Sequence, residues 1–278
     1  MAGFDPAFQE PGSTLTEAQL RASVRAATGG RDFGLHDSTW RSRFGNATRQ
    51  AARYRAGRVL VAGDAAHMHL PTGGVGLNVG VQDAMNLGWK LAAVVQGRAG
   101  DDLLDSYQAE RHPVGTALLT DTRAQTALIT TFTPEGLALR EVMAGLLARD
   151  PALGAELATR MSGLAVSYPP AKAGSVPGPH QLTGQRVPDL VADGTSLFQL
   201  LHAGRPVLLV FAGATVPDGT VAVARGLGIE THQAELWPGH EKVTAALVRP
   251  DGYLWWASDD PAGAGAPEIL RSLGVRFA

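Results

Sequence analysis

The feature that most constrains the fold of this chain is a strand-like run that ends at a carboxylate and leads into a glycine-rich loop. The apolar residues 58–62 are followed by Gly63-Asp64-Ala65-Ala66-His67 and then by Pro71-Thr72-Gly73-Gly74-Val75-Gly76-Leu77-Asn78. An amphipathic helix is expected from Asn78 onward. The order of strand, carboxylate, glycine loop and helix predicts a cofactor-binding cradle in an α/β fold.

The parts of this cradle suggest its chemistry. Asp64 is an acceptor for hydroxyl groups such as those of a ribose or ribityl chain. Gly73, Gly74 and Gly76 let backbone N–H groups approach a ligand, and a helix start favours an anionic or electron-rich group. An ordinary solvated turn uses the same residue types, because turns are rich in glycine for conformational reasons. The spacing alone therefore predicts a site without identifying its ligand.

Two helices are predicted around this region from apolar spacing. The first covers residues 14–28, with Thr14 as N-cap and Glu17 as its capping-box partner. The second follows the glycine loop, with a buried apolar stripe and a polar face opposite. The stripe comprises Val81, Ala84, Met85, Gly88, Leu91, Ala92 and Val95, and the polar face comprises Gln82, Asp83, Asn86 and Lys90.

A further helical region is predicted from near Asp101 to about Met161, with a kink or boundary at Pro113. Residues 40–44 and 49–58 are predicted to be strand-like pieces.

A change of composition at residues 167–188, which are rich in proline and glycine, indicates a linker. The segments after it predict a strand buried on both faces at 206–211, a helix at 221–227, a hairpin at 244–256 and a closing helix at 267–273. This order indicates a small α/β unit.

The composition argues against several functional classes. The chain has 278 residues, enough for two domains, and a formal net charge of −2, which gives no general attraction to nucleic acid or anionic membranes. It has no cysteine, no signal-like start and no apolar run long enough to span a membrane. We therefore expect a cytoplasmic protein that binds neither nucleic acid nor membrane. His67 and His69 have no accompanying carboxylate cluster, so no metal site is predicted.

Three motifs stand together in the chain: residues 63–67, residues 71–78, and Asp83-Ala84-x-Asn86-Leu87-x-Trp89-Lys90-Leu91-Ala92. They closely resemble the C-terminal flavin-binding segment of the class A flavoprotein aromatic hydroxylases. This is the p-hydroxybenzoate and phenol hydroxylase family, and the resemblance is greatest to members that hydroxylate aromatic polyketides. It continues through Tyr107-x-x-Glu110-Arg111-x-Pro113 and through residues 208–210 and 247–252.

The resemblance implies an α/β fold in which an incomplete flavin-binding domain with long helices precedes a small thioredoxin-like α/β domain without cysteines. Residues 1–57 would be the remnant of a substrate-binding domain, and residues 58–166 the C-terminal part of the FAD-binding domain. Residues 167–188 would form the linker, and residues 189–278 the thioredoxin-like domain.

The resemblance also implies FAD as cofactor, NAD(P)H as co-substrate and an aromatic small molecule as substrate. Gly63 and Asp64 would hold the ribityl chain, and Leu77 and Asn78 would face the pyrimidine edge of the flavin. The residues that would lie along the isoalloxazine ring are Pro71, Gly73, Gly74, Val75 and Gly76. No catalytic side chain is assigned.

The sequence departs from the family because the Gly-x-Gly-x-x-Gly unit that holds the FAD pyrophosphate does not precede Gly63. One explanation is a fragment or one half of a split enzyme, which would be the C-terminal portion of an FAD- and NAD(P)H-dependent aromatic monooxygenase. The others are a remnant without flavin and a protein recruited to a non-redox reaction. Either would be a partner subunit, a small-molecule binder or a cofactor-independent catalyst that uses Asp64, His67 or His69.

The same departure predicts an interaction partner. Strands of a doubly wound sheet are buried on both faces, so the absence of the first βαβ unit would expose apolar surface beside residues 59–61. We expect a complementary N-terminal polypeptide or a second copy of the chain to cover this edge.

Overall fold

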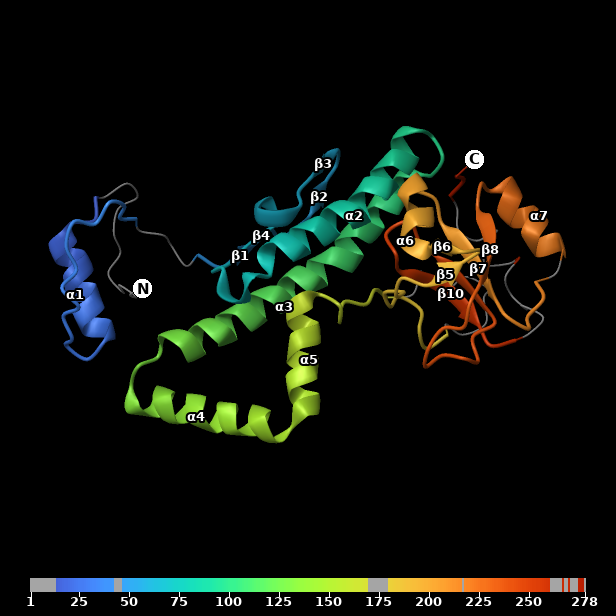
Figure 1. Ribbon diagram of the computed structural model, residues 1–278. Helices are drawn as coiled ribbons and strands as arrows, with labels where there is room; N and C mark the ends of the chain where they lie inside the picture. Colours follow the sequence, from blue (N-terminus) through green and yellow to red (C-terminus); the bar gives the residue numbers. More distant parts are fainter. Residues whose placement is uncertain are drawn as a thin grey trace.

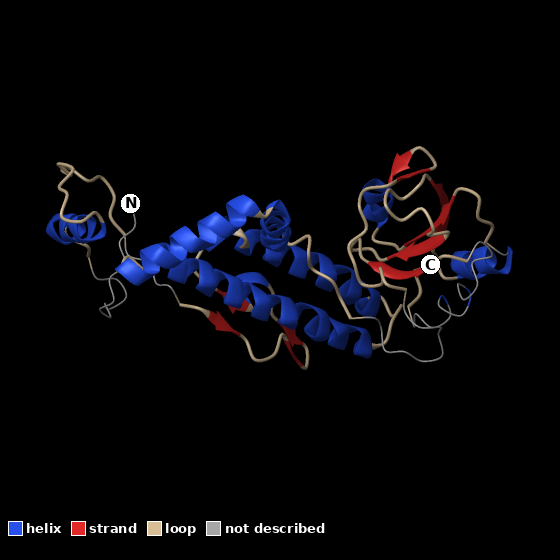
Figure 2. Cartoon of the chain, turned by 90° about the horizontal axis from the view of Figure 1, so that it is seen from below, coloured by secondary structure: helices blue, strands red, loops and turns tan. Residues whose placement is uncertain are grey.

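The computed structural model describes residues 14–42, 47–169, 180–216, 218–260, 267, 270 and 275–277. A helical unit, residues 49–162, occupies the middle of the molecule, and a C-terminal sheet unit, residues 180–277, lies at one end (Figure 1). Most of the strand structure belongs to the sheet unit, whereas long helices dominate the middle (Figure 2).

Helix α1 (Glu17–Ala27) lies at the opposite end of the molecule and buries none of its side chains (Figure 1). Its N-cap is Thr16, whose hydroxyl accepts a hydrogen bond from the Gln19 amide while the Gln19 side chain bonds the Thr16 amide. The predicted capping pair of Thr14 and Glu17 is wrong, because Thr16 and Gln19 satisfy the same kind of reciprocal bonds two residues later.

Four two-residue strands precede and follow the Gly63 turn. β1 (Arg49–Gln50) pairs antiparallel with β4 (His67–Met68), and β2 (Arg55–Ala56) pairs antiparallel with β3 (Val59–Leu60). The apolar run before Gly63 is therefore one arm of a short antiparallel hairpin with β2. Val59 in this run is 65% exposed, in agreement with the prediction that apolar surface is exposed beside residues 59–61.

The predicted strand-like piece at residues 40–44 is only partly described. Residues 40–42 form no strand, and residues 43 and 44 lie outside the described residues.

Two long helices form the centre of the helical unit. Helix α2 (Gly76–Val95) and helix α3 (Asp105–Thr130) lie side by side, joined through the 3-10 turn η3 (Asp101–Leu104) (Figure 1). Helices α4 (Pro134–Arg149) and α5 (Pro151–Ser162) follow, each with proline in its first turn and a capping side chain, Thr133 and Asp150 respectively.

The predicted burial of α2 is inverted. Its buried residues are Val79, Asp83, Asn86, Trp89, Lys90 and Ala93. On the predicted apolar stripe, Val81 is 54% exposed, Met85 52% and Val95 76%. The pattern has the correct period, but the polar face turns inward. Helix α3 supplies ion-pair partners for Asp83 and Lys90, and Asp251 of the sheet unit accepts a hydrogen bond from Trp89. We call the exposed residues Leu77, Val81, Met85, Leu91 and Val95 the apolar face of α2.

Helix α3 continues through Pro113, so of the two predicted alternatives, a kink or a boundary, the boundary is wrong. A proline inside a helix costs about 3 kcal/mol. Buried residues on both sides of it offset that cost: Tyr107 and Arg111 lie before Pro113, and Gly115 and Leu118 lie after it.

The sheet unit contains a six-stranded sheet with the order β10-β9-β7-β8-β5-β6. Its strands are β5 (Val191–Ala192), β6 (Thr195–Ser196), β7 (Val207–Phe211), β8 (Glu230–Ala234), β9 (Ala245–Val248) and β10 (Leu254–Ser258). Its helical segments are α6 (Leu197–Leu200), η4 (Leu201–Ala203) and α7 (Asp218–Gly226). Among the described strands of this sheet, β7 and β8 alone are parallel, joined by the crossover through α7, and the other pairs are antiparallel.

The central strand β7 is buried on both faces, which confirms the prediction for residues 206–211. Leu209 packs into a core on one face, and Leu208 packs on the other face with Trp89 and Ala93 of α2. The C-terminal end of α2 thus joins the hydrophobic core of the sheet. The predicted hairpin is also confirmed, as β9 and β10, and the helix predicted at 221–227 is α7.

Two other predictions concern segments that are only partly described. Residues 268–269 and 271–273 of the predicted closing helix lie outside the described residues, as do residues 170–179 of the predicted linker. On either side of that gap, Tyr168 and Leu182 are buried. None of the described helices is long and apolar enough to cross a bilayer.

Candidate functional site

The predicted cradle consists of two 3-10 turns and the start of α2. Gly63 begins the turn η1 (Gly63–Ala65), and the turn η2 (Thr72–Gly74) leads directly into α2. Gly63, Gly73 and Gly74 have φ angles of 56°, 75° and 67°, a left-handed conformation that residues with a side chain rarely adopt. The glycines are therefore required by the shape of the loop.

Asp64 lies on the exposed side of η1. Within the described part of the chain, its carboxylate makes no hydrogen bond and no ion pair. An exposed carboxylate without a protein partner is free to accept hydrogen bonds from the hydroxyl groups of a ligand.

The start of α2 is uncapped. Its N-cap residue, Val75, makes no side-chain capping hydrogen bond, so the N–H groups of the first turn have no side-chain acceptor at the N-cap. A helix of 20 residues carries about half a positive charge at this end. The first turn of α2 can therefore bind an anionic or electron-rich edge of a ligand.

The other predicted residues differ in exposure. Gly63 and Gly76 are half-buried, and Val75 is buried in a small core with Val79 and Leu118. The exposed ones are Pro71, Gly73, Gly74, Leu77 and Asn78. Val75 can therefore contribute only its backbone to a ligand, whereas the exposed residues form an open surface.

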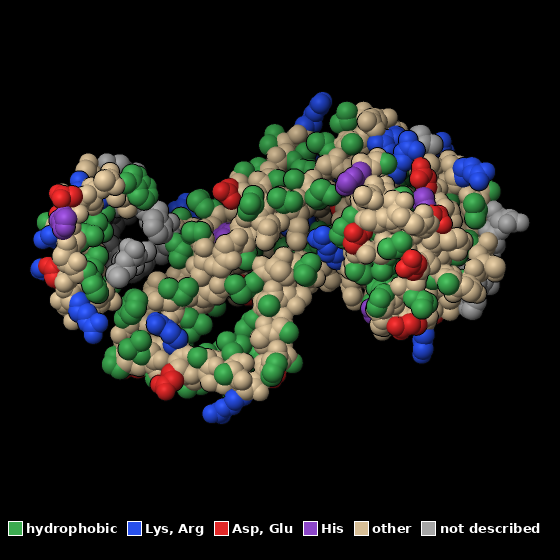
Figure 3. Space-filling model, in the orientation of Figure 1, with side chains coloured by type: hydrophobic (Ala, Val, Ile, Leu, Met, Phe, Trp, Pro, Cys, Tyr) green, Lys and Arg blue, Asp and Glu red, His purple; other side chains and the backbone are tan. Residues whose placement is uncertain are grey.

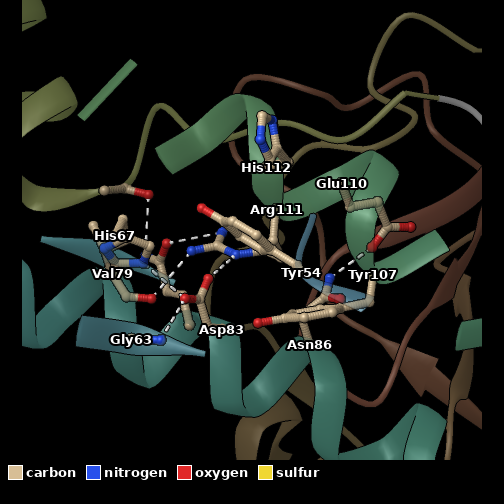
Figure 4. Close-up of polar contacts among 12 residues, drawn as sticks. Tyr54, Gly63, His67, Val79, Asp83, Asn86, Tyr107, Glu110, Arg111 and His112 are labelled. Atoms are coloured by element: carbon tan, nitrogen blue, oxygen red, sulfur yellow. Dashed lines mark hydrogen bonds and ion pairs between the residues drawn. The ribbon is translucent and has the colours of Figure 1, made fainter. Parts of the chain in front are cut away.

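A buried ion-pair cluster lies directly behind the Gly63 turn. The Asp83 carboxylate accepts hydrogen bonds from the Gly63 amide at 3.0 Å, from His67 Nε2 at 2.8 Å and from Arg111 Nε at 2.6 Å. Figure 4 shows these three groups converging on Asp83. We call Gly63, His67, Asp83 and Arg111 the Asp83 cluster.

The ionisation of Asp83 follows from these contacts. Burial by itself would raise its pKa. The hydrogen bond from His67 and the charge of Arg111 outweigh burial, so the pKa of Asp83 is lower than its ordinary value. Asp83 is therefore an anion that fixes the backbone of the turn.

A second cluster links both long helices to the β9–β10 hairpin. Glu110 accepts from Lys90 Nζ at 2.7 Å, from Asn86 Nδ2 at 2.6 Å and from both Arg249 Nη atoms at 2.8 and 2.9 Å. Arg249 also binds Asp251, with Nη2 to Oδ2 at 2.7 Å. We call these residues the Glu110 cluster.

Burial and charge have opposite effects on the acid and base of this cluster. Burial would raise the pKa of Glu110, but the charges of Arg249 and Lys90 lower it to about 2. Burial lowers the pKa of Lys90 to about 8, although Glu110 favours its charged form. These groups hold the helices and the sheet unit together and lie away from the exposed loop.

The two histidines of the predicted cradle have structural contacts. His67 is buried against Asp83, and His69 Nδ1 lies 2.7 Å from the Leu70 carbonyl oxygen. Among the residues that the structure describes, no three His, Cys, Asp or Glu side chains gather as a metal site would require.

Sequence reasoning missed both clusters as structural centres. Asp83, Asn86 and Lys90 were assigned to a polar face, which would ordinarily be solvated. The available signal was an acid and a base on each of two consecutive helices, Asp83 and Lys90 on one and Glu110 and Arg111 on the next, which can pair across the two helices.

The arrangement fits one kind of ligand. Asp64 offers an acceptor for hydroxyl groups, and the start of α2 offers N–H donors to an electron-rich ring edge. The left-handed glycines have no side chains, so a ligand can approach the backbone of the loop closely. A flat heterocycle that carries a polyol chain meets all three requirements.

Comparisons with known proteins agree with this chemistry. Residues 1–122 match the family model described as FAD binding domain, and residues 180–274 match the one described as aromatic-ring hydroxylase, C-terminal. An uncharacterized aromatic compound monooxygenase of Bacillus subtilis is 47% identical over 95% of this chain and 52% of its own length. A 12-dehydrotetracycline 5-monooxygenase/anhydrotetracycline 6-monooxygenase of Streptomyces rimosus is 44% identical over 98% of this chain and 54% of its own length.

A solved structure agrees as well. The anhydrotetracycline hydroxylase from Streptomyces rimosus superposes with a TM-score of 0.79 at 43% identity, covering 94% of this chain and 53% of that one. The chain thus spans about half the length of the curated relatives that it matches.

Proposed function

The chain belongs to the class A flavoprotein aromatic hydroxylases, and on that premise we propose that it is the C-terminal portion of an FAD- and NAD(P)H-dependent aromatic monooxygenase. The observation that carries the proposal is the exposed Asp64 carboxylate, which has no partner among the described residues, beside the uncapped start of α2. Because the chain spans about half of its relatives' length, the activity is assigned to the complete enzyme of which it is a part.

The proposed roles follow from the geometry of the cradle. Asp64 would accept hydrogen bonds from the ribityl hydroxyls of FAD, with Gly63 leaving room for the chain. Pro71 and the backbone of residues 73–76 would lie along the isoalloxazine. Leu77 and Asn78 would face its pyrimidine edge, where the start of α2 stabilises negative charge.

When bound, FAD would supply the redox chemistry that inserts oxygen into an aromatic substrate, with NAD(P)H as the reductant. The described residues would bind and orient the flavin and keep its pyrimidine edge next to N–H donors. The relatives named for tetracycline intermediates favour a polycyclic phenol of polyketide type as the substrate.

The proposed domain organisation keeps the boundaries expected from the sequence. Residues 1–57 belong to the substrate-binding part, 58–166 to the FAD-binding domain, 167–188 to the linker and 189–278 to a thioredoxin-like domain. The parallel β7–α7–β8 crossover and the antiparallel hairpin beside it support a thioredoxin-like arrangement. Without cysteines this domain would not exchange dithiols, so packing is its proposed role.

The proposed partner of the apolar face of α2 is a polypeptide equivalent to the rest of the relatives' FAD-binding fold. Leu77 is 78% exposed and Val95 76%, and hydrophobic side chains spread over the middle of the molecule in Figure 3. Isolated exposed apolar residues are common, but a helix with its charges buried and its apolar stripe exposed is shaped for contact with protein. The length that the chain shares with its relatives supports this occupant over a second copy.

Isotope labelling of the complete enzyme tests the proposed activity. With FAD, NADPH, a polycyclic phenol and labelled oxygen gas, we expect NADPH oxidation that depends on the phenol, and one labelled oxygen atom in the product. Asp64→Ala should reduce turnover at limiting FAD and recover at excess FAD, because it removes a cofactor contact. Asp102→Ala, a change at another exposed aspartate, should leave turnover unchanged.

Product that forms without labelled oxygen, or turnover that needs no FAD, would exclude the monooxygenase activity.

The oligomeric state of the isolated chain, measured by light scattering, tests which partner covers the apolar face of α2. Self-association that Val81→Asp abolishes would assign the apolar face of α2 to a second copy instead.

A further inference from the structure

We infer that the Tyr168 hydroxyl is a positioning group for the Gly63–Asp64 turn, because it ties this turn to the C-terminal sheet unit through Arg111 and Asp83. The inference rests on the proposed function for the identity of the ligand. The contacts that carry it belong to the protein alone.

The first link joins Asp83 to the turn. Both Asp83 oxygens are engaged, Oδ2 by the Gly63 amide and His67 and Oδ1 by Arg111. Gly63 directly precedes Asp64, so the direction of the Asp64 carboxylate depends on where this amide is held. Glycine is conformationally free at its φ of 56°, so the contact from Asp83 restrains a residue that has no side chain to restrain it.

The second link fixes Arg111. Its guanidinium is fully buried. Nη2 donates a hydrogen bond to the Val79 carbonyl at 3.1 Å, and Nη1 donates one to the Tyr168 hydroxyl at 3.2 Å. A buried guanidinium that loses an acceptor must shift to find another. Gln82 Oε1 already lies at the longer distance of 3.5 Å from Nη1.

The third link seats Tyr168 on the sheet unit. The Tyr168 amide donates to the Gly184 carbonyl at 2.9 Å, and its ring lies 4.1 Å from the Tyr253 ring between centroids. The Arg249 guanidinium lies 5.0 Å from the same ring. A methyl group on Gly184 would come within 1.9 Å of the Tyr168 carbonyl oxygen, so the contact is close. Tyr168 therefore moves with the sheet unit, and the turn follows through Arg111 and Asp83.

The test compares Tyr168→Phe with Tyr54→Phe by hydrogen–deuterium exchange without any flavin. Both changes remove one buried hydroxyl and keep the ring, but the Tyr54 hydroxyl accepts from Gln50 rather than from Arg111. We expect the peptide that contains Gly63 to exchange about tenfold faster in Tyr168→Phe only, since one buried hydrogen bond is worth about that factor.

Arg111→Lys provides a second variant, because lysine keeps the positive charge that pairs with Asp83 but lacks the guanidinium group that reaches the Tyr168 hydroxyl. It should loosen the same peptide. Equal exchange of the Gly63 peptide in wild type, Tyr168→Phe and Arg111→Lys would overturn the inference.

FAD titration then separates the two proposals. Weaker FAD binding by Tyr168→Phe, by about three- to tenfold, with Tyr54→Phe unchanged, supports both of them. Faster exchange in a chain that takes up no FAD would remove the proposed function and leave the positioning role. Unchanged exchange in a chain that binds FAD would remove the positioning role and leave the proposed function.

Discussion

In the sheet unit all five residues of β7 are apolar and buried, whereas α2 of the helical unit buries Asp83, Asn86 and Lys90 and exposes Val81 and Met85. β7 is the continuous apolar run expected of a strand buried on both faces, and α2 has the apolar period expected of a helix. The sheet unit is stabilised by an ordinary hydrophobic core, whereas buried ion pairs join the long helices of the helical unit. The difference teaches that a periodic pattern predicts which residues share a face, but the partners of that face decide whether it is buried.

The largest expected effect on stability comes from removing a charge of the Glu110 cluster. Arg249→Met would leave Glu110 and Asp251 buried without their main cation. We expect a loss of about 3–5 kcal/mol in the free energy of unfolding, measured by urea denaturation. Arg205→Met, at an exposed arginine of the sheet unit, is the control and should change stability by less than about 0.5 kcal/mol. A similarly small effect at both positions would show that the Glu110 cluster does not stabilise the fold.

The next effect contrasts two apolar truncations. Leu209→Ala in β7 should cost about 2–5 kcal/mol, because Leu209 is fully buried in the sheet core. Val81→Ala on the apolar face of α2 should cost less than about 0.5 kcal/mol in the isolated chain. A large cost at Val81 would mean that this face is already covered in solution, and it would erase the contrast between the two units.

The pH dependence sharpens the comparison further. The pKa of Glu110 is about 2 in the folded chain and ordinarily about 4.5. Because the folded value is the lower one, its stabilisation is complete above about pH 4.5 and is lost as the pH falls from there toward about 2. Urea denaturation across that range should show a steep decline in stability. Glu110→Gln should be less stable near neutral pH but should decline less on acidification, and parallel curves would contradict the assignment.

In the sheet unit the sequence predicted the central strand β7 and the β9–β10 hairpin, which lie in apolar cores, but not the strands β5, β6 and β8. The run at 206–211 and the hairpin around Asp251 follow from local composition and turn residues alone. The prediction failed at the faces of α2 and as to a helix boundary at Pro113, where long-range partners outweigh local preference. Arg111 and Glu110 come from another helix, and Arg249 from the turn between β9 and β10, far along the chain.

The candidate site divides in the same way. Glycine positions with left-handed φ and the exposed Asp64 could be predicted from the motif, because they depend on local backbone geometry. The groups that hold the turn from behind could not, because nothing in the local sequence of Gly63 indicates that Asp83 accepts its amide. The roles of the site residues toward FAD stay predictions that binding experiments must test.

The most direct test of the flavin cradle is a fluorescence titration of the chain with FAD, competed by riboflavin or by AMP. The described site would contact the ribityl chain and the ring, so riboflavin should compete and AMP should not. Asp64→Asn should weaken binding about tenfold, as expected for a lost charge-assisted hydrogen bond, while Asp102→Asn should bind as the wild type does. Competition by AMP alone, or equal FAD affinity in Asp64→Asn and wild type, would contradict the placement of the flavin at this loop.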